Sequence, residues 1–170
     1  MPKAVIIYVR YIEKTNRAVG RFSMYLVFAM MGVLLFESVS RTAFKEPHIW
    51  VVEMAQFTMA AYYLLGGGYS MILDGHVRMD LLYGRWPPKK QAMADANTAF
   101  FLVFYLVFLL AGGISSIEYA MEYGQTNYTP WSPPLAPIKI IMAIGIALML
   151  LQVIATFFRD LAKVRGETIP

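Results

Sequence analysis

Long apolar runs alternate with short polar segments along the chain. Four runs, at about residues 19–39, 50–73, 97–119 and 138–158, are each roughly 20 residues long and nearly free of charge. A helix crosses the bilayer core with roughly 20 apolar residues, whereas a barrel strand shows about ten residues of alternating polarity. The pattern therefore predicts an all-α integral membrane protein with four transmembrane helices, in a single membrane domain over residues 1–170.

Helix-breaking residues mark the connections between these runs. Pro47 lies in the first connection and predicts that a helix restarts near Trp50. Pro87 and Pro88 disfavour a continuous helix across the second connection. The third connection, about residues 121–137, is rich in proline and aromatic residues and contains neither Lys nor Arg.

Residues 1–18 acquire two distinct faces when they are placed on a helix. One face is apolar and carries Val5, Tyr8, Val9 and Ile12. Another face is basic and carries Arg10, Lys14 and Arg17. This pattern is typical of a short basic amphipathic helix lying on the inner membrane surface. A frayed cytoplasmic tail is the alternative.

The composition and the placement of charge agree with a membrane location. The chain is 58% hydrophobic and 15% charged, against about 45–50% and 25% in a soluble domain. Twelve of its 15 Lys and Arg residues lie in the amino-terminal segment, the second connection and the carboxy-terminal tail. Because short cytoplasmic segments are enriched in these residues, both termini and the central connection are predicted to be cytoplasmic. The net charge of +4 then needs no nucleic-acid partner.

Residues that could carry chemistry are few. Catalysis needs a nucleophile beside a base, or a metal cluster, and the chain has no cysteine. Its two histidines, His48 and His76, are 28 residues apart, or about 42 Å along a helix, so they cannot ligate one haem together. We predict no catalytic residue, no metal site, no bound cofactor and no enzyme activity.

Polar and small residues form a stripe along the second run. Glu53, Ala60, Gly67 and Asp74 recur every seven residues, a spacing that drifts only about 20° per step around a helix. Such a stripe indicates packing against another helix, in this chain or in a partner. A transport role for Glu53 is the alternative, although this acid lies near the end of its span.

The third and fourth runs contain small residues that also indicate packing faces. They are Ala111, Gly112, Ser115 and Ser116 in the third run, and Ala143, Gly145 and Ala147 in the fourth. Polar residues that could line a pore are scarce, so the chain is expected to pack against a larger partner rather than to transport by itself.

The block from Trp50 to Leu82 resembles a known family. It reads Trp50-x-x-Glu53, then Gly66-Gly67-Gly68, then Asp74-Gly75-His76-Val77-Arg78-Met79-Asp80-Leu81-Leu82. This is similar to the small, DctQ-like membrane subunit of TRAP transporters, the tripartite ATP-independent periplasmic systems. Leu151-Gln152 followed by Arg159 fits as well, and Trp131-Ser132-Pro133-Pro134 is similar to the branch named for mannitol and chloroaromatic compounds.

The resemblance implies partners in a bacterial inner membrane. A large membrane subunit would carry substrate and sodium by an elevator-like motion, and a periplasmic binding protein would deliver the substrate, often an organic acid. The small subunit would brace the large one and widen the docking surface for the binding protein. The outer segments 42–49 and 121–137 are the expected contacts for that protein.

The resemblance also suggests roles for single residues. Trp50 and Glu53 would hold the outer end of the second span. His76, Arg78 and Asp80 would lie at the inner membrane interface, as membrane anchors or as contacts with the large subunit.

Two other interpretations stay open on the sequence alone. A stand-alone four-helix exporter would need an essential acid deep inside a span. A haem-type membrane anchor subunit would need histidines closer together than His48 and His76.

Overall fold

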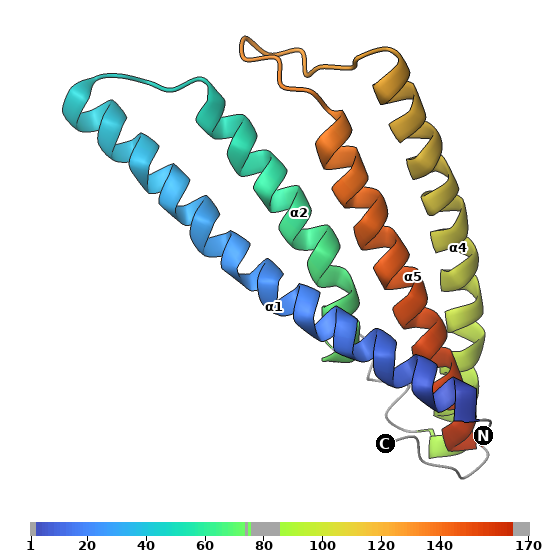
Figure 1. Ribbon diagram of the computed structural model, residues 1–170. Coiled ribbons are helices and arrows are strands. Elements are labelled where there is room, and N and C mark those ends of the chain that lie inside the picture. Colours follow the sequence, from blue (N-terminus) through green and yellow to red (C-terminus); the bar gives the residue numbers. More distant parts are fainter. Residues whose placement is uncertain (1–2, 74, 76–85, 165–170) are drawn as a thin grey trace.

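Four long helices form the molecule, which we describe from a computed structural model that covers residues 3–73, 75 and 86–164. They are α1 (Lys3–Val39), α2 (Trp50–Ile72), α4 (Pro88–Glu122) and α5 (Ala136–Val164), and a short π-helix, η1 (Ser40–Phe44), continues α1 (Figure 1). Each predicted apolar run coincides with one helix, so the prediction of an all-α membrane protein is confirmed.

Three stretches are long and apolar enough to cross a membrane by length and composition: Ala4–Phe44, Met93–Glu122 and Ala136–Ala162. The fourth predicted span, α2, is not among them. Its 23 residues extend about 35 Å, so its polar residues rather than its length set it apart. Because α2 packs against both α1 and α5, it meets less lipid than an outer helix does, and a helix so enclosed tolerates polar side chains.

The amino-terminal segment differs from the prediction of a separate surface helix or a frayed tail. Helix α1 runs without interruption from Lys3 to Val39. The predicted amphipathic pattern is present, but its apolar face covers protein: Val9 and Ile12 are buried in a cluster with Ala155 of α5. The change from polar to apolar sequence therefore marks no break in the backbone.

The helix ends follow local rules. Lys45 ends η1 in the left-handed conformation, and α2 begins three residues beyond Pro47, as predicted. Helix α4 begins at Pro88, where proline's missing N–H would have no partner anyway. At the other end of α4, Gly124 has a φ of 56° and the Gln125 amide donates to the Ala120 carbonyl over 3.0 Å, which is a Schellman ending.

Helix α5 is the centre of the bundle. It packs against α1, α2 and α4, and its core contact with α4 is made by Leu106, Ile146 and Val153. Figure 1 shows the helices close together where α1 begins and α5 ends, and spread apart toward the connections 45–49 and 123–135. We call these the convergent end and the divergent end. The start of α1 and the end of α5 thus lie at the same end of the bundle.

Candidate functional site

Three helices meet at a buried polar contact near the convergent end, which we call the Asn16 node. Asn16 of α1 donates from its Nδ2 to Oε1 of Gln152 on α5 over 2.9 Å, and both side chains are buried. The Oδ1 atom of Asn16 lies against Gly68 of α2, where an added Cβ would be 2.6 Å from it. Glycine at position 68 therefore lets the amide side chain enter between the helices.

Two further contacts fasten the first half of α1 to α5. The Tyr8 hydroxyl donates to the Leu151 carbonyl over 3.1 Å, and Glu13 forms an ion pair with Arg159. These contacts were not predicted from the sequence. The available signal was Asn16 itself, a polar residue four positions after Ile12 on the apolar face of α1.

Glycines bring the helix backbones together along the same region. Gly20 of α1 lies against the Tyr69 side chain of α2. A Cβ at Gly145 of α5 would be 2.7 Å from the Leu64 carbonyl oxygen, an atom of helix backbone that cannot turn aside. The predicted role of Gly145 as a close-packing residue of the fourth run is thus met inside this chain.

Glu37 organises the first connection at the divergent end. Its Oε1 accepts from Arg41 Nη2 over 3.0 Å, the contact expected from their four-residue spacing. Its Oε2 accepts from the His48 backbone amide over 3.1 Å and lies 3.2 Å from His48 Nδ1. Trp50 stacks on Phe36, with ring centroids 6.5 Å apart. One carboxylate and one aromatic pair therefore join the end of α1 to the start of α2.

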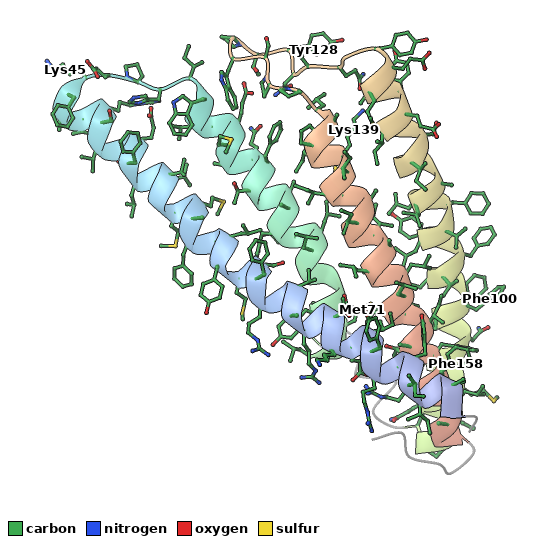
Figure 2. The ribbon with its side chains drawn as sticks, viewed as in Figure 1. Lys45, Met71, Phe100, Tyr128, Lys139 and Phe158 are labelled. Atoms are coloured by element: carbon green, nitrogen blue, oxygen red, sulfur yellow. The ribbon has the colours of Figure 1, made fainter. Side chains whose placement is uncertain are left out.

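The third connection, between α4 and α5, also lies at this end and is held by Lys139 of α5. Its Nζ donates to Gln125 Oε1 over 2.7 Å and to the Ser116 carbonyl over 3.2 Å. The Leu135 amide donates back to the Gln125 carbonyl over 2.9 Å, which closes the loop. Tyr128 is fully exposed on this loop, above Lys139 in the view of Figure 2. The loop thus presents an aromatic side chain on a constrained backbone.

The stripe predicted along α2 is described at three of its four positions. Glu53 is only 4% exposed, and its Oε2 has no hydrogen-bond partner in the part of the chain that the structure describes. Ala60 is half-buried. A Cβ at Gly67 would be 3.3 Å from Met149 Sδ, so this position packs on α5 of the same chain.

The remaining predicted positions cannot be placed. Asp74, His76, Arg78 and Asp80 lie outside the described residues. His48 contacts Glu37, and within residues 3–73, 75 and 86–164 no three His, Cys, Asp or Glu side chains are grouped as metal ligands.

One predicted packing face is left uncovered by this chain. Ala111, Gly112 and Ser115 of α4 are exposed, and an added Cβ at Gly112 would meet no atom within 4 Å. Below them on α4, Phe100 points away from the bundle in Figure 2. Helix α4 packs mainly on α5, so its opposite side is available to lipid or to another protein.

One protein family matches nearly the whole chain. The model of the family described as "Tripartite ATP-independent periplasmic transporters, DctQ component" matches residues 6–163. The chain belongs to the DctQ family. The match runs from the first turn of α1 almost to the end of α5, so it includes the Asn16 node and both connections. No curated protein matched the sequence.

Membership of the DctQ family is consistent with the uncovered face of α4. A DctQ chain is one component of a tripartite transporter, so it is a small membrane subunit that works with other components. The family match confirms the resemblance found in the block from Trp50 to Leu82.

Proposed function

We propose that this DctQ chain braces the large membrane subunit of its transporter and helps to dock the periplasmic binding protein. The transporter would take up a small organic solute, with carboxylates as the expected class, by ion-coupled transport across a bacterial inner membrane. Both termini would be cytoplasmic, and the divergent end of the bundle would face the periplasm.

The uncovered small-residue face of α4 carries the first half of this proposal. Ala111, Gly112 and Ser115 are exposed, although small residues in a membrane helix favour close helix contact. Lipid chains gain nothing from small residues, whereas a second helix can approach its backbone there. This face therefore suits a helix of the large subunit.

The ordered loop at the divergent end supports the docking role. Its exposed aromatic side chains, Tyr128 and Trp131, stand on a backbone held by the contact of Lys139 with Gln125. Rigid exposed aromatic residues are favoured at protein interfaces because little side-chain entropy is lost on binding. The predicted contact segment 121–137 thus has the surface that a docking protein needs.

Co-purification tests the bracing role. Gly112→Leu should reduce recovery of the large subunit by tenfold or more when both chains are co-expressed and purified in mild detergent. Gly32→Leu on α1 is the matched control, because an added Cβ at Gly32 also meets nothing within 4 Å. If Gly112→Leu retains the partner as the wild type does, the α4 face is not the contact. Recovery of a homodimer alone would instead support the exporter hypothesis.

Uptake into proteoliposomes tests the docking role. Replacing Tyr128 and Trp131 by alanine should lower uptake that depends on the binding protein, while the large subunit still co-purifies. Tyr11→Ala is the control, since Tyr11 is also an exposed aromatic residue but lies near the start of α1. Unchanged uptake at limiting concentrations of the binding protein would exclude this loop as a docking element.

A further inference from the structure

Four basic side chains form one edge of α1 near the convergent end, which we call the basic edge. It consists of Arg10, Lys14, Arg17 and Arg21, and all four are exposed. At 100° per residue their spacing of four, three and four places them within about 60° of one another around the helix. Arg10 and Arg21 are separated by about 16 Å along the axis.

These cations are not neutralised within the described chain. None of the four forms an ion pair or a hydrogen bond with a described residue. The neighbouring acid Glu13 is already paired with Arg159 of α5. Within the described residues, the basic edge therefore carries four cations that have no ion-pair partner.

A hollow of about 660 Å³ lies along this edge. Ala18 lines the hollow together with the longer side chains of Lys14, Arg17 and Arg21. At the side nearer the apolar run, the hollow is bordered by Phe22 and Tyr25, which are both exposed. Glu13, the acid that is paired with Arg159, also lines the hollow. The hollow therefore changes from mainly basic to aromatic along the helix axis.

This order of side chains matches the layers of a membrane surface. Aromatic residues are enriched at the level of the lipid headgroups, where apolar chains give way to water. Phe22 and Tyr25 lie in the first turns of the apolar run that begins near residue 19, and the basic edge precedes them. A phosphate group held by the cations would place its acyl chains beside the two rings.

We infer that the basic edge of α1 is a binding site for the headgroup of an anionic phospholipid. The phosphodiester contacts Arg17, Arg21 and Lys14, and Arg10 adds long-range attraction. The opposite side of this segment, with Val9, Ile12 and Asn16, is buried against α5. The bound lipid therefore lies on the side of α1 that faces away from α5, and it would stabilise the contact of α1 with α5. This inference does not depend on the proposed docking role.

Native mass spectrometry of the complete chain, released from nanodiscs with defined mixtures of phosphatidylglycerol and phosphatidylcholine, tests the inference. The wild type should retain phosphatidylglycerol in preference to phosphatidylcholine. A basic residue near an anionic surface contributes about fivefold to binding, so Arg17→Gln with Arg21→Gln should reduce this preference by about 25-fold. Arg17→Lys with Arg21→Lys keeps the charge and should retain most of it.

The matched control removes two charges elsewhere. Lys89→Gln with Lys90→Gln, at the start of α4, should leave the lipid preference within about twofold of the wild type. No preference in the wild type, or an equal loss in this control, would overturn the inference. An unchanged preference combined with loss of the large subunit from the Arg17→Gln, Arg21→Gln variant would assign the edge to a protein partner instead. Circular dichroism of each variant verifies that the helices are intact.

Discussion

The two ends of the bundle are held by contacts of very different range along the chain. At the convergent end, the hydrogen bond of Asn16 with Gln152 joins residues 136 positions apart, and Tyr8 reaches Leu151 across 143 positions. At the divergent end, Glu37 contacts His48 across 11 positions and Lys139 contacts Gln125 across 14. The convergent end is thus a tertiary clamp, whereas each outer connection is shaped mostly by its own neighbours.

This difference predicts that the convergent end determines the helix packing, whereas the outer connections determine the exposed surface. Changes at the convergent end should loosen the whole bundle, because three helices share the same contacts. Changes in an outer connection should alter what a partner meets and leave the helix packing intact. The outer loops can therefore vary in sequence with little cost to the fold.

The largest effect is expected from Gly145→Ala. The added Cβ would be 2.7 Å from the Leu64 carbonyl oxygen, so α2 and α5 must separate, and overpacking of this kind costs about 1–3 kcal/mol. Equilibrium unfolding in mixed micelles, followed by circular dichroism, measures the loss. Gly113→Ala is the control because its Cβ meets nothing within 4 Å. Equal stabilities of the two variants would show that the clamp is not tightly packed.

A smaller effect is expected from the Asn16 node. A double-mutant cycle with Asn16→Leu and Gln152→Leu should give a coupling energy of about 0.6 kcal/mol, the average for hydrogen bonds between membrane helices, and of at most about 1.7 kcal/mol. The same unfolding assay measures all four proteins of the cycle. Additive effects of the two substitutions would mean that their 2.9 Å hydrogen bond contributes no coupling to the clamp.

The smallest effect on the whole bundle is expected from Glu37→Gln. The variant loses the charged contact with Arg41 and weakens the contact with His48, but both partners lie within 11 positions of Glu37 in the sequence. Hydrogen exchange of the His48 amide should accelerate, while the unfolding midpoint should change less than in either clamp variant. A shift of the midpoint as large as that of Gly145→Ala would remove the distinction between the two ends.

The helices could be predicted from the sequence because run length and proline positions are local properties. The segment 1–18, expected as a short surface helix or a frayed tail, is instead, from Lys3 onward, the first part of a longer helix for a physical reason. Polarity changes there, but no proline interrupts the hydrogen bonding, and a single Gly20 is tolerated in a helix at a cost of about 1 kcal/mol. Backbone continuity depends on helix breakers, not on which solvent the side chains face.

Side-chain contacts can be predicted from a sequence only where their spacing is local. Glu37 and Arg41 are four residues apart on one continuous helical segment, a spacing that favours their pairing. Asn16 and Gln152 carry no local signal of each other, since a single polar residue on an apolar face fits many partners. The stripe of α2 was predicted as a packing face without a defined partner, and the structure shows that its Gly67 meets Met149 of the same chain.

The continuity of α1 also gives it mechanical properties. Its close contact with α2, at Gly20 and Tyr69, can act as a fulcrum. About 26 Å of helix precedes this point and about 36 Å follows it up to Phe44, at 1.5 Å per residue. The far end is joined to the start of α2 through Glu37 and His48, so a displacement there would move α1 and α2 together about this contact.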